Sequence, residues 1–458
     1  MRSIIGTFLS LLILISACRK DERITTDPNA KLTFSSNSLL FDTVFTSIGS
    51  TVRKIKILNK NNGALNISEI KLSGGNLSPF SININGQNLS NQTNLRLNGQ
   101  DSLNLFVKVT INPDAKILTF LVQDSIILTT NGNRQVVKLE AYGQNAVFIS
   151  NQSITTNTTW TKNLPYIING SITLKNGSTL SILPGAKIYF HKDAIMNIEG
   201  VLNASGTIIE PIEFCSDRLE TVYSDEPGQW KGIYLKSTGT GIIKNSIIKN
   251  ASIGITSDSL SINNTPKLIL SNNVIKNMQV AAYIGYHSEL LAFNNLMHNC
   301  GNYIIYAIGG GNYNLKQNTF AGFNLNFPRK TAALTFSDYL SAKAFNKLQL
   351  NLTNNIIWGN LSNELDIQKK TAATVQTTLI NNLIKTTNTG YNINGNIVNI
   401  DPLFASSNRG NFELSSNSPA IKKGVNLSTD IYFNVYLNKD LNNSTRIFPS
   451  SLGCYENY

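Results

Sequence analysis

Much of the chain alternates apolar and polar residues over short runs, a pattern that predicts β-strands rather than helices. Between residues 147 and 400 one unit recurs: two polar residues, usually including Asn, and then a short apolar run. Copies of the unit begin at Asn245, Asn272, Asn294, Gln317, Asn354 and Asn381. The starts are 22 to 37 residues apart. This spacing suits a coil of three short strands and three turns, which needs roughly 20–30 residues at about 3.3 Å per strand residue.

Such a coil is too small to bury its own apolar face, so successive coils must stack. Stacking at about 4.8 Å pairs the backbone groups of neighbouring coils and aligns their apolar side chains in internal columns. Asn tolerates a left-handed backbone at the bends, and its amide can bond to the equivalent amide one coil away, forming a ladder. A leucine-rich repeat is the main alternative, but its LxxLxL signature is absent. The repeats therefore predict a single-stranded parallel β-helix over residues 147–400.

The first coils carry a family resemblance. Ile172–Phe190, Ile198–Thr207 and the Trp-x-Gly-Ile segment at Gln229–Leu235 resemble the opening coils of secreted bacterial right-handed β-helix proteins. Residues 401–458, which end in Gly453-Cys454-Tyr455-Glu456, resemble the last coil and C-terminal cap of such proteins, where Ala usually stands at the position of Cys454. A cap covers a sheet edge that would otherwise be open to pairing. The polar residues expected to be structural there are Asp401, Asp440, Arg446 and Glu456.

Residues 30–146 show short alternating runs with turn signals between them, which predict a β-sandwich. Three segments, Phe41–Val44, Ile57–Gly63 and Val137–Gly143, resemble immunoglobulin-like modules of the Hydin and abnormal-spindle type. That resemblance implies a spacer or a binding platform. The fold class predicted for the whole chain is therefore all-β, with an N-terminal immunoglobulin-like sandwich followed by a right-handed parallel β-helix and a cap.

The N-terminus predicts export. Arg2 precedes an apolar run, Ile4–Ile15, that is too short to span a bilayer, and Ile15-Ser16-Ala17-Cys18 resembles a lipobox. We expect a signal peptide over residues 1–17, lipidation of Cys18 and a tether over residues 18–29. Lys20-Asp21-Glu22 resembles the surface-export signal of Bacteroidetes lipoproteins, although a solvated charged tether would look the same. The expectation is a cell-surface lipoprotein of the outer membrane, held through its lipid.

Charge and cysteine content limit the classes of binding partner and cofactor that we expect. The formal net charge is +12, but charged residues make up only 14% of the chain and form no basic run. A basic surface attracts anions, including acidic polysaccharides, whereas export argues against nucleic acid. Apart from Cys18, the chain has three cysteines, Cys215, Cys300 and Cys454, and none of them forms a CxxC pair. We expect buried thiols, with one disulfide as the alternative, a monomeric chain, and neither a metal nor a cofactor.

Catalytic signatures are weak. Hydrolases of this fold use paired carboxylates, whereas acids between residues 230 and 400 are sparse: Asp258, Glu289, Asp338, Glu364 and Asp366. Residues 323–339 fill the longest interval between repeats, and we expect them to leave the stack as a loop. Aromatic, His and basic residues suggest a ligand surface of Trp230, Tyr283, Tyr286, His287, Tyr303, Tyr306, Arg329 and Lys330. Ordinary turn and surface roles are the plainer interpretation of these residues.

The leading hypothesis is an envelope lipoprotein that binds glycans or other surface partners without a catalytic site. The alternative is a divergent polysaccharide lyase or glycoside hydrolase with a pectate-lyase-like β-helix.

Overall fold

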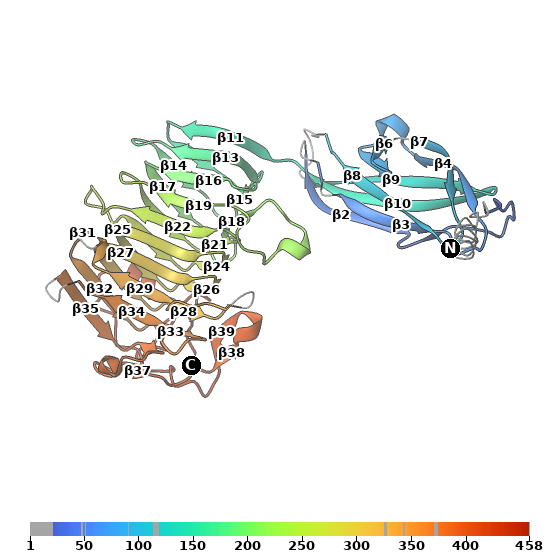
Figure 1. Cartoon of the computed structure of the whole chain (residues 1–458). Coiled ribbons are helices and arrows are strands. Elements are labelled where there is room, and N and C mark those ends of the chain that lie inside the picture. The colour runs from blue at the N-terminus through green and yellow to red at the C-terminus, as the bar shows by residue number, and fades with distance from the viewer. Residues whose placement is uncertain are drawn as a thin grey trace, which may run out of the picture. The chain divides into compact units, whose positions relative to one another are not determined.

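The computed structural model of the chain describes residues 22–46, 49–50, 52–89, 91–112, 119–324, 328–341, 344–370 and 374–457. The chain divides between Asn145 and Ala146 into two compact units, both built almost entirely of strands (Figure 1). The predicted signal peptide, Cys18 and most of the export motif lie outside the described residues. Within the described ranges, no helix is long and apolar enough to cross a membrane.

The first unit is a β-sandwich of two five-stranded sheets, as predicted. Alternate residues face inward, for example Ile55 and Ile57 on one strand and Leu105, Val107 and Val109 on its neighbour. One sheet has the order β1 (Thr33–Phe34), β3 (Arg53–Leu58), β8 (Ser102–Val109), β5 (Phe80–Ile84) and β6 (Gln87–Leu89). The other has the order β2 (Ser38–Phe45), β10 (Asn133–Gln144), β9 (Thr119–Thr130), β4 (Leu65–Leu72) and β7 (Asn91–Leu97).

The described part of the expected tether packs on this sandwich. Ile24 forms a parallel β-bridge with Ala64, and the backbone amide of Gly99 donates to the Glu22 carboxylate at 2.6 Å. The side chain of Asn133 donates to the carbonyl of Pro28 at 2.7 Å. These bonds hold the described part of the predicted tether, residues 22–29, on the sandwich, so this part is not a free linker.

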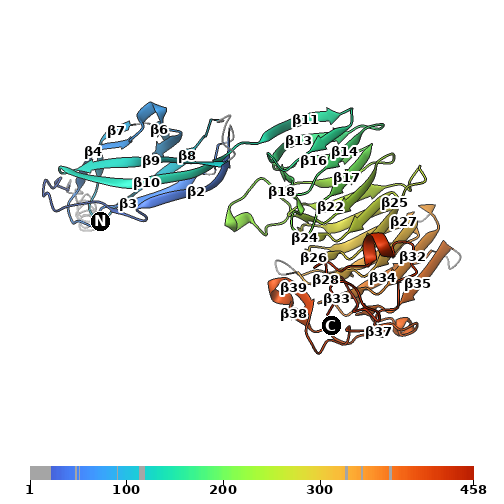
Figure 2. The ribbon, with the colours of Figure 1, turned by 180° about the vertical axis from the view of Figure 1, so that it is seen from behind.

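The second unit is the predicted parallel β-helix (Figures 1 and 2). Among the described residues, 25 strands join in one assembly, and from β13 to β22 each strand pairs in parallel with the strand three positions later. The coils therefore present three faces, which we call A, B and C.

Face A contains β16 (Ile195–Ile198), β19 (Gly232–Leu235), β22 (Ile253–Asp258), the first parts of β25 (Ala281–Phe293) and β27 (Tyr303–Lys316), β29 (Leu334–Ser337) and β34 (Leu365–Gln368). Face B contains β12 (Thr158–Trp160), β14 (Thr179–Ile182), β17 (Val201–Ser205), β20 (Thr240–Lys244), β23 (Leu268–Ser271), the second parts of β25 and β27, β32 (Leu348–Thr353) and β35 (Val375–Ile380). Face C contains β15 (Lys187–Phe190), β18 (Ile212–Ser216), β21 (Ser246–Lys249), β24 (Val274–Met278), β26 (Leu296–Cys300), β28 (Thr319–Gly322), β33 (Ile356–Gly359), β36 (Leu383–Ile384) and β37 (Ile397–Val398).

Strand β13 (Tyr166–Leu174) pairs with β15 of face C and with β16 of face A, and β11 (Val147–Ile154) pairs with β13. Two hairpins lie outside the stack, β30 (Tyr339–Ser341) with β31 (Ala344–Phe345), and β38 (Phe404–Ser406) with β39 (Asn411–Leu414). Short helical turns are η1 (Gly75–Leu77), η2 (Thr221–Tyr223), η4 (Thr389–Tyr391), η5 (Ser407–Arg409) and η6 (Phe433–Leu437).

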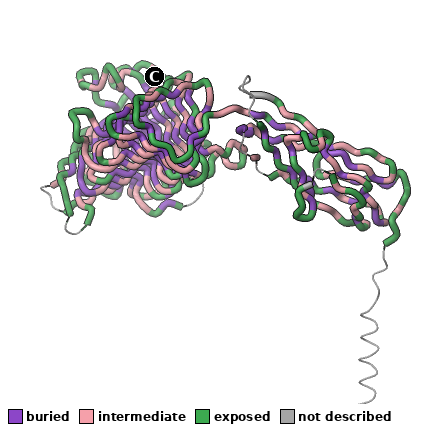
Figure 3. The backbone as a smooth tube through the Cα atoms, turned by 90° about the horizontal axis from the view of Figure 1, so that it is seen from above, coloured by how far each residue is buried: buried purple, intermediate pink, exposed green. Residues whose placement is uncertain are grey.

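The interior of the β-helix is filled by columns of apolar side chains. Buried residues, purple in Figure 3, recur from coil to coil of this unit. The column behind face A runs through Ile172, Met196, Ile233, Ile255, Tyr283, Ile305, Leu334 and Leu365. Each of these side chains is at most 2% exposed. Burial of one such side chain contributes about 1.5–3 kcal/mol, and no coil could bury it alone.

The polar pairs that open each repeat have two separate roles. The first residue takes a left-handed backbone, with φ between 47° and 59° at the six positions from Asn245 to Asn381. From Asn273 onward the second residue is an asparagine that is buried in a ladder of amides. In the ladder, each Nδ2 donates to the next Oδ1 at 2.9–3.0 Å through Asn273, Asn295, Asn318, Asn355, Asn382 and Asn396. The ladder predicted from the repeats is confirmed.

The C-terminal segment, residues 401–457, does more than cap the last coil. The left-handed asparagines anchor it in reverse order along the stack: Asn381 donates to the carbonyl of Lys423, Asn354 to Val425 and Asn272 to Asp440. Helical turn η6 therefore lies across the coils (Figure 2). Leu427 and Leu437 cover Ile269, Leu291 and Phe293, which point outward from face B. The expected cap is also a strap over apolar side chains that would otherwise meet water.

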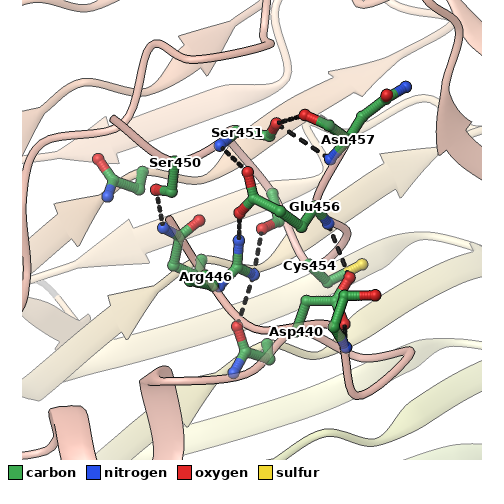
Figure 4. Close-up of polar contacts among 12 residues, drawn as sticks. Asp440, Arg446, Ser450, Ser451, Cys454, Glu456 and Asn457 are labelled. Atoms are coloured by element: carbon green, nitrogen blue, oxygen red, sulfur yellow. Dashed lines mark hydrogen bonds and ion pairs between the residues drawn. The ribbon is translucent and has the colours of Figure 1, made fainter. Parts of the chain in front are cut away.

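A buried polar cluster fixes this segment (Figure 4). Arg446 pairs with Glu456 at 3.0 Å and donates to the side chain of Asn294 at 2.8 Å. The Glu456 amide donates to Asp440 at 2.7 Å. These three charged residues have the structural role expected for them. Asp401 does not belong to the cluster, because its carboxylate accepts from the Leu403 amide at 2.7 Å and lines a separate cavity.

Cys215, Cys300 and Cys454 are unpaired and buried, as expected. Burial is the main cause that raises the pKa of each thiol to about 12. These side chains are packing residues rather than nucleophiles.

Candidate functional site

Face A carries tyrosines on its outer side. The outward residues Tyr234, Thr256, Ile284, Tyr306, Thr335 and Asp366 occupy one column, each paired in register with the next. Tyr286 stands in the adjacent column, in register with Asp258 and Ile308. Because neighbouring coils are about 4.8 Å apart, this column presents aromatic and polar side chains at short, regular intervals along the stack.

Two of the tyrosine rings near this face stack on each other, and lysines lie over two more. Tyr303 and Tyr306 stack with centroids 4.4 Å apart and an interplanar angle of 24°. The Lys236 ammonium lies 3.6 Å from the Tyr234 centroid, and Lys370 lies 5.8 Å from that of Tyr339. We call Tyr234, Tyr286, Tyr303, Tyr306 and Tyr339 the tyrosine surface.

A cavity of about 500 Å³, the face A cavity, opens beside the stacked pair. Its lining includes Tyr303, Tyr306, Lys330, Thr335, Asp366 and Gln368. The Thr335 hydroxyl has no partner within the described part of the chain. Burial, reinforced by the neighbouring tyrosines, raises the pKa of Tyr306, so its hydroxyl stays protonated and can donate. The cavity thus combines aromatic faces with donors and acceptors.

Sequence reasoning found part of this site. Tyr303, Tyr306 and Lys330 meet in the cavity as candidate ligand residues, and Tyr286 lies on the same face, 36% exposed. The assignment of Trp230 and Tyr283 to the ligand surface is wrong, because both are core residues. Trp230 is 1% exposed and stacks on Phe190 at 4.0 Å, while Tyr283 is fully buried in the column behind face A.

Arg329 has an internal role, and His287 contacts the backbone of the next coil. The Arg329 guanidinium is 2% exposed and pairs with the fully buried Glu364 at 2.6 Å. His287 lies at a break in the register of β25 with β27, has φ of 46°, and its Nδ1 is 2.9 Å from the Gly309 carbonyl oxygen. Arg329 is therefore not a surface ligand residue, whereas His287 stays partly exposed beside the face A strands.

The long interval between repeats leaves the stack only in part. Residues 323–324, 328–333, 338–341 and 344–347 lie outside the face A strands, but Leu334–Ser337 forms β29 and pairs with β27 and β34. The prediction of one continuous loop over residues 323–339 is therefore wrong. Asp338 is buried and accepts from the Lys370 amide at 2.8 Å.

The sequence analysis did not assign five other residues to this surface: Tyr234, Thr335, Asp366, Gln368 and Tyr339. Their signal is positional: Thr335 and Asp366 each follow an inward Leu and fall in the column of Tyr306. That register becomes visible only once the turn lengths are known.

The face A cavity holds aromatic rings, a lysine and a carboxylate. Asp366 is the only carboxylate among its described lining residues, whereas glycoside hydrolysis ordinarily uses two. No group of three or more His, Cys, Asp or Glu that could hold a metal ion occurs in the described ranges. Aromatic faces with a few convergent polar groups are typical of small-molecule and sugar sites.

No protein-family model matches the chain. A search of curated proteins likewise finds no match. Solved structures align at low similarity. XylC in complex with xylose is 10% identical, with 92% of this chain and 89% of that chain covered and a TM-score of 0.41. The catalytic unit of a GH87 α-1,3-glucanase from Streptomyces thermodiastaticus is 10% identical over 72% of this chain and 73% of its own, with a TM-score of 0.30.

A family 123 glycoside hydrolase from Clostridium perfringens aligns over 28% of this chain at 11% identity, with a TM-score of 0.20. This chain covers 30% of the length of that hydrolase chain.

Proposed function

We propose that the protein binds a glycan on the tyrosine surface and in the face A cavity. The observation that carries the proposal is the stacked Tyr303–Tyr306 pair beside Lys330, Thr335 and Asp366. Sugar rings present flat C–H faces that pack on aromatic rings, while their hydroxyls need donors and acceptors around the edge. The surface extends over several coils, from β19 to β34, which suits a chain of sugars better than a single one.

Replacement of both Tyr303 and Tyr306 by Ala is expected to weaken glycan binding at least about tenfold, because two central aromatic contacts are removed. Binding would be measured by calorimetry against polygalacturonate, alginate, xylan and mannan. Tyr142→Ala, at a 44% exposed tyrosine of the sandwich, is the matched control and should bind like the unmodified protein. Unchanged affinity in the double variant, with circular dichroism intact, would contradict the proposal.

Polysaccharide cleavage is the second candidate function. It is favoured by the presence of Asp366 and Lys330 in one cavity, since a carboxylate and an ammonium can act as base and charge stabiliser at a sugar carboxylate. Reducing ends and the absorbance of unsaturated products would be followed on the same glycans. Turnover that disappears in Asp366→Asn, with binding retained, would make the protein an enzyme.

We further propose that Cys18 is lipidated and that the immunoglobulin-like sandwich serves as a spacer at the cell surface. Cys18→Ser is expected to abolish labelling by an alkyne fatty acid and to release the protein from the membrane fraction, because a protein without acyl chains lacks the anchor. Substitution of Lys20 and Asp21 by Ala should keep the label but lower surface exposure to added protease. A Cys18→Ser protein that keeps its label would exclude this lipidation.

A further inference from the structure

A second cavity lies near the face A cavity, across one turn of the chain. Its volume is about 420 Å³, and its lining includes Phe323, Trp358, Lys385, Asp401 and Phe404. Trp358 belongs to face C, in register with Ala321, and points outward because its neighbour Ile357 fills the core. The hairpin that follows Asp401 supplies the opposite wall. We call this the face C cavity.

The face C cavity repeats the chemistry of the face A cavity. The Lys385 ammonium lies 5.1 Å from the Trp358 ring centroid and donates to the Gly359 carbonyl at 2.7 Å. The rings of Phe323 and Phe404 meet edge to face at 6.4 Å. Each cavity therefore offers an aromatic ring, one lysine and one aspartate, which is a set that suits a sugar ring.

The turn between the two cavities lines both of them, and a buried ion pair holds it in place. Asn360 lines the face C cavity, and the residues that follow it, 361–363, line the face A cavity. Glu364 accepts from the Leu361 amide at 2.9 Å and from the Ala333 amide at 3.0 Å. Arg329 joins Glu364 to the Gly322 carbonyl, at 2.7 Å. The buried pair thus fixes both sides of the partition, so the cavities keep a constant separation.

We propose that the face C cavity is a second subsite for the same glycan, and that one polysaccharide chain crosses the 360–364 turn to occupy both cavities. This inference rests on the proposed function, because it assigns further sugar units to the same ligand. Two linked subsites raise affinity steeply once a ligand is long enough to reach both, since the second contact becomes intramolecular.

The test uses galacturonate and xylose oligomers of increasing length, from dimers to octamers, with dissociation constants measured by calorimetry on the full chain. Affinity is expected to rise at least about tenfold above a threshold length. Lys385→Gln should remove that rise while leaving the affinity for the dimer unchanged. Tyr306→Ala should weaken every length. A Lys385→Gln protein that keeps the length dependence overturns the inference.

Tryptophan fluorescence gives an independent readout. Trp160 and Trp230 lie inside the β-helix, 4% and 1% exposed. Trp358 is also largely buried, at 8% exposed, in a cluster outside the coils, but it lines the face C cavity. Oligomers above the threshold should shift the emission, dimers should not, and Trp358→Phe should abolish the shift. Emission that is unchanged by long, tightly bound oligomers overturns the inference while the proposed function stands. Failure of every oligomer and polymer to bind overturns both.

Discussion

Replacing Asn318 by Ala is expected to lower the free energy of unfolding of the β-helix by about 3–5 kcal/mol, a loss at the extreme of single substitutions. The Asn318 amide donates to the Ala292 carbonyl at 2.9 Å and to Asn355 at 3.0 Å, and its oxygen accepts from Asn295 twice, at 2.9 Å each. Alanine leaves these buried partners unsatisfied, at about 1–3 kcal/mol each. Denaturant unfolding followed by circular dichroism measures the change.

Asn302→Ala is the matched control, because this exposed asparagine lies outside the ladder, and its change should stay within about 0.5 kcal/mol. Asn318→Asp separates bonding from packing. It keeps the shape but loses both donors and places a carboxylate oxygen against the Asn355 oxygen, so it should destabilise at least as much as Ala. A loss below about 1 kcal/mol in both Asn318 variants would show that the ladder contributes little.

The fold could be predicted because its determinants are local. The polar pair at each repeat marks a bend, and the apolar run after it forms a strand of face C. Each coil repeats the same problem, an apolar face too large for the coil to bury, and stacking is the solution at every step. The bends predicted from turn residues and the columns predicted from apolar residues are therefore compatible at every coil. The spacing of the asparagines from Asn273 and Asn295 onward predicts the ladder.

The site was less predictable, because it depends on register and on distant partners. Whether Tyr283 or Tyr286 points inward depends on where the strand begins, and adjacent segments differ in turn length. The sequence alone does not distinguish Arg329 from a surface arginine, because its partner Glu364 is 35 residues away along the chain. The path of the C-terminal segment along the stack likewise depends on pairings across up to 168 residues, such as Asn272 with Asp440. Local sequence patterns do not predict such long-range pairings.

Glu364→Gln is expected to destabilise the β-helix by about 3–5 kcal/mol, because it leaves the Arg329 guanidinium charged, buried and without its counter-ion. The same substitution should also weaken glycan binding, since Glu364 fixes the Leu361 and Ala333 amides at the edge of the face A cavity. Unfolding free energy and the calorimetric dissociation constant would be measured on one preparation. Lys175→Met, which breaks an exposed pair with Glu199, is the control and should cost at most about 1 kcal/mol.

A double-mutant cycle separates charge from architecture. If the cost of Glu364→Gln comes from the orphaned cation, Arg329→Met combined with Glu364→Gln should be more stable than Glu364→Gln alone, because no buried charge remains. Binding should not recover with stability, since methionine cannot bond the Gly322 carbonyl that ties the turn to face C. Recovery of both together would mean that the pair supports the fold only, whereas recovery of stability alone identifies Arg329 as the residue that positions the partition between the two cavities.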